Sequence, residues 1–231
     1  ILARSLETPT VLLSEEDFFF GDESEYIVLD GFQGSIIVDP DAEVVERYAN
    51  LQEEMKAQNE EIFSADNTEH KISTVDGTQV ELLANINLLS DVRSAQKAGT
   101  AGVGLYRSEY LFLVRNDFAS EEEQLQIYKR LLGEMDPVYF RTMDIGGDKR
   151  LSSSKETEEN NPFMGLRAIR YALQNPLVFK TQIRALLQAG LERDLRILFP
   201  LISGPEEFFQ AKKLTREVMQ ELSEEGIEHN R

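Results

Sequence analysis

Residues 138–150 read VYFRTMDIGGDKR, an apolar run that passes directly into charged residues and glycines. The run Val138-Tyr139-Phe140 has the β-branched and aromatic composition of a buried strand. Arg141, Asp144, the pair Gly146-Gly147 and further charged residues follow it. Such a strand end is either an ordinary surface turn or one side of a site, and the flanking sequence has to distinguish the two.

This strand belongs to a series of alternating strands and helices that begins near residue 79. The apolar runs predict strands at 80–86, 102–106, 138–142 and 195–202. Caps and helical periodicity predict helices at 89–99, 120–134, 162–189 (broken near Asn175-Pro176) and 205–226. This alternation implies an α/β fold with parallel strands. The sheet is either open and doubly wound or half of a (β/α)₈ barrel, because a whole barrel needs about 250 residues and eight such units.

The sequence before residue 79 has a different character. Two short apolar runs at 27–29 and 35–38 flank the glycine-containing stretch 30–34, which predicts a hairpin-like turn in a β-rich segment. From 41 to 63, apolar residues recur at helical spacing among Glu, Gln and Lys, which predicts one long exposed helix. We therefore divide the chain into a β-rich segment at 1–40, a helical linker at 41–78 and a strand–helix domain at 79–231.

Composition narrows the possible partners. The chain of 231 residues has a formal net charge of −18, which argues against nucleic acid or membrane lipid as the main partner. It contains no cysteine, so disulfides and thiolate chemistry are excluded within it, and a cytoplasmic location is expected. No apolar run approaches the roughly 20 residues that span a bilayer. The opening ILARSLETPTV has neither an initiator Met nor the order of a signal peptide, so we expect the chain to be an interior part of a longer protein.

The strand ends carry the candidate site. The second and third predicted strands end in Arg107 and Arg141. Because the carboxyl ends of parallel strands meet at one edge of the sheet, the two guanidiniums should converge on a spot suited to a phosphate or carboxylate. The competing interpretation is that each arginine pairs with a nearby acid, Glu109 or Asp144, and only fixes a loop. Gly146-Gly147 is likewise either a loop that admits an anion or a simple turn.

Three motifs carry a resemblance to a known family. GVGLYRSEYLFL, RTMDIGGDKR and NPFMGLRAIR, in this order and spacing, resemble the Enzyme I family of the bacterial sugar phosphotransferase system, the phosphoenolpyruvate-protein phosphotransferases. VLDGFQGSIIVDP resembles the close of that family's swivelling phosphohistidine domain, and the likeness extends along nearly the whole chain. Pyruvate phosphate dikinase and phosphoenolpyruvate synthase share the Gly-x-Gly-Leu-x-Arg-x-Glu strand and not the RTMDIGGDK form, so the Enzyme I family is the better match.

The resemblance implies a fold, a reaction and a substrate site. The fold would be a (β/α)₈ barrel of which the first four βα units are present, preceded by the linker helix and the tail of the swivelling domain. The reaction would be phosphoryl transfer from phosphoenolpyruvate to an enzyme histidine and on to a phosphocarrier protein, the first step of sugar uptake. Family members bind the substrate phosphate with the arginines that match Arg107, Arg141 and Arg167. Periodicity alone places Arg167 on a solvated helix face. Ser108 stands where the family commonly has Thr, and it keeps the hydroxyl.

The resemblance also places several functional parts outside this chain. The phosphorylated histidine would precede Ile1, and the Glu and Asp that bind Mg²⁺ would follow Arg231, together with a cysteine acid. We therefore expect no catalytic residue and no metal ligand in this chain, and no turnover by it alone. His70 and His229 are expected to be surface residues. The phosphocarrier protein would dock on a further helical domain, and the full-length protein would be a homodimer; a half barrel alone should self-associate.

Two other functions remain open. The chain could belong to a dikinase or synthase relative that uses nucleotide through a separate domain. It could instead be a non-catalytic regulatory module that keeps anion-binding arginines without the metal half of the site.

Overall fold

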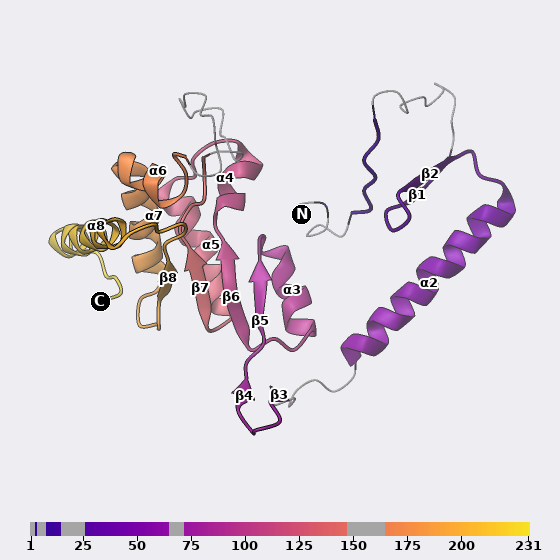
Figure 1. Ribbon diagram of the computed structural model, residues 1–231, viewed down its shortest axis with the longest axis horizontal. Coiled ribbons are helices and arrows are strands. Elements are labelled where there is room, and N and C mark those ends of the chain that lie inside the picture. Colours follow the sequence, from indigo (N-terminus) through magenta and orange to yellow (C-terminus); the bar gives the residue numbers. More distant parts are fainter. Residues whose placement is uncertain (1–2, 4–7, 15–25, 65–71, 147–164) are drawn as a thin grey trace. The chain divides into compact units, whose positions relative to one another are not determined.

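A computed structural model describes residues 3, 8–14, 26–64, 72–146 and 165–231 (Figure 1). By its internal contacts the chain forms two compact units, Ile1–His70 with Lys97–Gly99, and Lys71–Gln96 with Thr100–Arg231. The division lies within the range expected for the linker. The three domain assignments themselves stay predictions, and each unit is described by itself.

The first unit contains the predicted hairpin and the predicted long helix. Strands β1 (Ile27–Asp30) and β2 (Ser35–Val38) pair antiparallel, and α2 (Ala42–Ser64) follows them. In the hairpin turn, Oδ1 of Asp30 accepts the N–H groups of Phe32 and Gln33, each at 2.9 Å. These hydrogen bonds, the one from Gln33 first, hold the pKa of Asp30 below its ordinary value. The predicted hairpin and the predicted long helix are both confirmed.

The second unit is built on a parallel sheet of four strands in the order β5-β6-β7-β8 (Figure 1). Their bounds are β5 Leu83–Ile86, β6 Gly102–Arg107, β7 Val138–Arg141 and β8 Arg196–Leu198. The alternation of strands and helices and the parallel pairing are confirmed; a complete barrel is not shown.

Three strands are shorter than the sequence predicted: β7 by one residue, and β5 and β8 by more. Val80 belongs to a separate hairpin, in which β3 (Ile72–Ser73) and β4 (Gln79–Val80) pair antiparallel across a turn at Gly77 with φ +87°. Val80, at the start of the predicted strand, therefore pairs within this hairpin and does not join the parallel sheet. The last strand ends at Leu198; further on, Pro200 has no N–H for the ladder and Leu201 has a φ of +57°, so the predicted continuation to 202 does not form.

Helices connect the strands. They are α3 (Ser90–Lys97), α4 (Glu109–Arg115), α5 (Glu121–Glu134), α6 (Ile169–Gln174), α7 (Pro176–Ala189) and α8 (Pro205–Glu224). The break at Asn175 is confirmed, whereas α4 was not predicted. Among the residues that the structure describes, no helix combines the length and the apolar character needed to cross a bilayer.

The main core lies between the sheet and its helices. The rings of Tyr106 in β6 and Phe140 in β7 pack edge-on against Tyr128 of α5, at centroid distances of 6.1 and 5.2 Å. All three side chains are buried. Successive strand residues point to opposite faces, so the next residue of each strand, Arg107 or Arg141, projects from the face that α5 does not cover.

A capping box fixes the start of α5 and supports a first prediction. Oγ of Ser120 accepts the N–H of Glu123 at 3.3 Å, and the Glu123 carboxylate accepts the N–H of Ser120 at 2.9 Å. Ser120→Ala should lower the free energy of unfolding by about 1 kcal/mol, measured by urea titration. Ser120→Asp keeps an acceptor and serves as control; an equal loss for both variants would contradict the role of the cap.

Candidate anion-binding site

The two strand-end arginines lie side by side. Arg107 and Arg141 are direct partners in the parallel pairing of β6 with β7. Partners in register project their side chains from the same face of the sheet. The structure therefore brings the two predicted residues to one place at the carboxyl edge.

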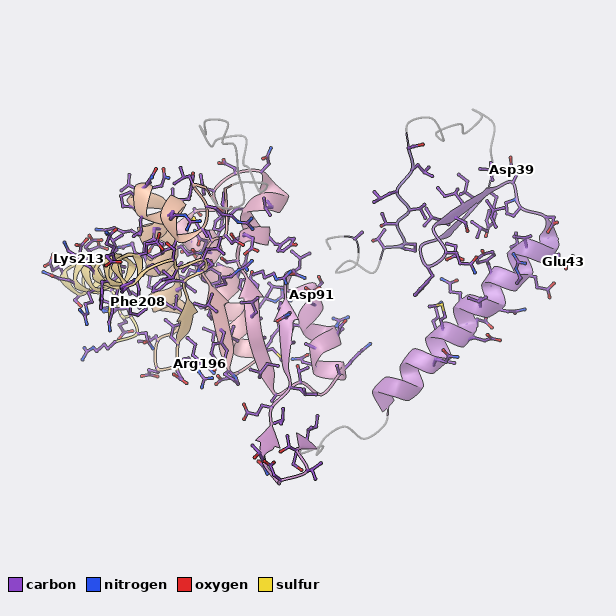
Figure 2. All side chains as sticks on the ribbon, viewed as in Figure 1. Asp39, Glu43, Asp91, Arg196, Phe208 and Lys213 are labelled. Atoms are coloured by element: carbon purple, nitrogen blue, oxygen red, sulfur yellow. The ribbon has the colours of Figure 1, made fainter. Side chains whose placement is uncertain are left out.

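The end of the first parallel strand adds an amide to this edge. Oδ1 of Asn87 lies 3.5 Å from Nη1 of Arg107, a long hydrogen bond. Asp91, labelled in Figure 2, lies in the first turn of α3. Its Oδ2 accepts the N–H groups of Asn87 and Leu88 at 2.8 and 3.1 Å, which fixes the turn that presents Asn87. The Arg107 side chain is therefore supported from the neighbouring strand.

Buried carboxylates hold the second arginine. Nη2 of Arg141 donates to Oε1 of Glu109, whose side chain is fully buried, and lies 3.4 Å from Oδ2 of Asp144. Both acids were named from the sequence as the partners that would fix a loop. The ion pairs exist, and they also hold the guanidinium in a single orientation at the strand end.

Arg167 joins the same cluster through Asp144. Its Nε and Nη2 donate to the two carboxylate oxygens of Asp144, at 2.7 and 3.1 Å, in the bidentate arrangement that is strongest for this pair. The Arg167 side chain is only 13% exposed. The expectation of a solvated helix face was wrong, because residues 165–168 precede α6 and are not helical.

Gly146 makes this approach possible. It has φ +109° and forms an antiparallel bridge with Arg167. A Cβ at this position would lie 2.3 Å from the carbonyl oxygen of Leu166 and 2.9 Å from Cα of Arg167. The glycine is therefore required by the close passage of the chain that carries Arg167. Gly147, Asp148 and Lys149 lie outside the described residues.

Several buried polar atoms at this edge have no hydrogen-bond partner among the described residues. Nε of Arg107, Nε of Arg141 and Oγ1 of Thr142 are buried and make no hydrogen bond to the part of the chain that the structure describes. An unsatisfied buried donor costs about 1–3 kcal/mol, so such atoms commonly mark a place for a ligand, a water or an ion. Within the described residues, three guanidiniums stand beside two carboxylates, Glu109 and Asp144, and this balance favours an anion.

A metal site is not found within the described residues. No three His, Asp or Glu side chains come together there in a way that could hold a metal ion. His70 lies outside the described residues. His229 is half-buried rather than fully exposed, and its Nδ1 lies 2.9 Å from the carbonyl oxygen of Ile227 in the C-terminal turn. The described residues therefore provide no such group of metal ligands.

One residue of the site region was missed. Gln182 is completely buried in α7 and contacts the ends of both β6 and β7. It interrupts the apolar stripe formed by Phe179, Ile183 and Leu186. A polar residue in such a stripe is an available sequence signal, because burying an amide is costly unless it is hydrogen-bonded.

The fold and the site together define an α/β protein with an arginine cluster at the carboxyl edge of a parallel sheet. Residues 62–231 match the family described as PEP-utilising enzyme, PEP-binding domain. This match covers most of the chain, and the chain belongs to that family.

Curated relatives match along almost the whole chain. It is 40% identical to the phosphoenolpyruvate-protein phosphotransferase of Priestia megaterium over 230 residues, which are 99% of this chain and 40% of that protein. The protein of the same name from Listeria monocytogenes is 38% identical over 230 residues, again 99% of this chain and 40% of the relative. That from Staphylococcus carnosus is 39% identical with the same coverage, 99% and 40%. The chain thus spans about 40% of the length of these relatives.

Proposed function

We propose that the arginine cluster binds the phosphate group of phosphoenolpyruvate. We further propose that the chain holds this substrate in a phosphoenolpyruvate-protein phosphotransferase. The phosphoryl group would pass to a histidine of the enzyme and then to a phosphocarrier protein. The observation that carries the proposal is the convergence of Arg107, Arg141 and Arg167 on one sheet edge with buried donors left over. The relatives' name supplies the substrate class.

The chemistry of phosphoryl transfer fits this arrangement. In the transition state, negative charge is spread over the three equatorial oxygens of the phosphoryl group, and the protein's contribution is to position and neutralise them. Guanidinium groups suit this role because each can donate two parallel hydrogen bonds to a phosphate. Glu109 and Asp144 hold Arg141 and Arg167 in place before the substrate arrives, so little reorganisation is needed when it binds.

The remaining parts of the assignment are proposals on the same basis. Mg²⁺, when bound, would stabilise the enolate that leaves; its ligands would lie outside this chain, and we assign no step to it. We also propose a (β/α)₈ barrel for the complete domain, a homodimer and a cytoplasmic location. The domain proposal is a swivelling-domain segment at 1–40, a linker at 41–78 and the substrate domain at 79–231.

A phosphate-binding site makes a direct prediction about ligand selectivity. In calorimetric titration of the chain, phosphoenolpyruvate should bind more tightly than inorganic phosphate, and pyruvate, which has no phosphate, should bind most weakly. Raising the salt concentration should weaken phosphoenolpyruvate binding, because the attraction is electrostatic. Equal binding of pyruvate and phosphoenolpyruvate would contradict the assignment of the arginines.

The other functions are distinguished by assays of turnover. A dikinase or synthase relative would need a nucleotide for its reaction, whereas the proposed enzyme would not. A regulatory module would bind phosphoenolpyruvate without any transfer in the protein that contains the chain. The inactivity of the chain by itself stays a prediction, tested by adding Mg²⁺ and the phosphocarrier protein and measuring pyruvate release.

A further inference from the structure

We propose that Gln182, although it lies on a helix behind the sheet, is a positioning residue for the arginine cluster. The inference rests on the proposed function, because it concerns the affinity of that same site. Gln182 would act by holding the two strand ends from which Arg107 and Arg141 project. It is not proposed to contact the substrate.

Each polar atom of the Gln182 side chain has a protein partner. Its Nε2 donates to Oγ of Ser108 at 2.9 Å and to the hydroxyl of Tyr128 at 3.1 Å. Its Oε1 accepts the N–H of Met143 at 2.8 Å. The amide therefore joins α7 to α5, to the residue after β6 and to the extension of β7.

Ser108 and Gln182 together replace a missing residue of the sheet. The ladder between β6 and β7 ends at the pair Arg107 and Arg141. Beyond this pair, Oγ of Ser108 donates to the carbonyl oxygen of Arg141 at 2.7 Å. Oε1 of Gln182 accepts the N–H of Met143. In a parallel sheet, a single residue of the neighbouring strand would satisfy both of these backbone groups, which flank Thr142.

On the side that faces β8, the residues that follow β7 are still hydrogen-bonded to a strand. The N–H of Thr142 donates to the carbonyl oxygen of Leu198 in β8 at 3.0 Å. Main-chain hydrogen bonding on both edges thus continues past the end of β7. Asp144, the partner of Arg141 and Arg167, directly follows the residue that Gln182 holds. A change at Gln182 should therefore reach the guanidiniums of both arginines.

The far end of the network keeps Gln182 in one orientation. The Tyr128 hydroxyl donates to Oε1 of Gln124 at 3.0 Å, and Nε2 of Gln124 donates to the carbonyl oxygen of Ala119 at 2.9 Å. Burial raises the pKa of Tyr128, so its hydroxyl keeps its proton and remains a donor. Because the N–H of Met143 can only donate, Oε1 of Gln182 must face it and Nε2 must face Ser108 and Tyr128. Exchanging the amide oxygen and nitrogen would break these hydrogen bonds.

The test compares two neutral substitutions in the same helix. Gln182→Met removes the contacts with both strand ends and should weaken phosphoenolpyruvate binding by about tenfold. Gln188→Met removes an amide that donates to Glu121 and, among the described residues, makes no contact with the strand ends, so it should leave the affinity unchanged. Calorimetry measures the affinity, and urea titration measures the stability of each variant. The Arg141 and Arg167 Nε–H signals in NMR spectra should shift in the Gln182 variant alone.

A second pair of variants covers the case in which Gln182→Met does not fold. Ser108→Ala should weaken binding, and Ser108→Thr, which keeps the hydroxyl, should not. If wild-type chain binds neither phosphoenolpyruvate nor inorganic phosphate, the proposed function fails and this inference fails with it. If wild-type chain binds and a folded Gln182→Met or Ser108→Ala variant binds equally well, the inference alone is overturned.

Discussion

Replacing Arg141 by alanine is expected to weaken phosphoenolpyruvate binding by about 10- to 100-fold, because a hydrogen bond to a charged group contributes about 1.5–3 kcal/mol. The side chain is 16% exposed and has a buried Nε with no partner in the described residues. Its guanidinium is therefore both held in place and still able to donate. Calorimetric titration of wild type and variant measures the difference, and equal affinities would contradict the assignment.

The Arg141 experiment needs a variant that protects the fold. Arg141→Ala leaves the fully buried Glu109 carboxylate without this ion pair, which can cost about 3–5 kcal/mol of stability. The double variant Arg141→Met with Glu109→Gln removes both charges and should stay folded while losing affinity. Should this folded double variant bind as well as wild type, the phosphate would have to be held elsewhere.

A matched control separates the local effect from the loss of one positive charge. Arg196, labelled in Figure 2, is the first residue of β8 and pairs in register with Tyr139, two residues before Arg141 on β7. Its guanidinium lies over the ring of Tyr139, 4.8 Å from the centroid, and it pairs with Asp194. Arg196→Met should leave phosphoenolpyruvate affinity within about twofold, because its charge is already paired with the exposed Asp194 and no contact joins it to the cluster residues within the described part of the chain.

The elements that could be predicted from the sequence are those with clear caps or a regular spacing of apolar residues. The α5 helix was predicted from Ser120 and its acidic first turn, and the capping box accounts for this success. The helix α4 was missed because EYLFLVR reads as an apolar run without a visible period. It is only 7 residues long and ends at Asn116, its C-cap residue, which has a left-handed backbone conformation. Short elements of this kind depend on tertiary packing, here of Phe112 in a second buried cluster.

The candidate site was predictable where it depends on strand ends and unpredictable where it depends on long-range packing. Arg107 and Arg141 could be paired because consecutive parallel strands place their last residues together. The structural position of Arg167 could not be derived, because it arises from a bridge to Gly146 across a segment that has no periodic signal. Only the family resemblance pointed to this residue. Gln182 within the apolar stripe of α7 was an available signal for a buried amide, but its partners at the two strand ends could not be derived from a single sequence.

Replacing Gly146 by alanine should displace Arg167 and destabilise the protein by about 2–4 kcal/mol, since it adds backbone strain and overpacking at one position. The backbone of Gly146 has φ +109°, a conformation that residues with a side chain rarely adopt. The added Cβ would lie 2.3 Å from the Leu166 carbonyl oxygen. The nearest atoms are all backbone atoms of Leu166 and Arg167, which leave little room for relief. Urea titration measures the stability, and calorimetry should find weaker phosphoenolpyruvate binding.

The cause of that binding loss can be separated into strain and displacement. Gly77→Ala introduces alanine at a similar φ of +87° with nothing within 4 Å of the new Cβ, so it should cost less stability and no affinity. Arg167→Met should weaken binding directly. If Gly146 acts through Arg167, the two substitutions together should weaken binding little more than Arg167→Met alone, because both remove the same contact. Fully additive effects would mean that Gly146 supports the anion site by another route, such as the placement of Asp144.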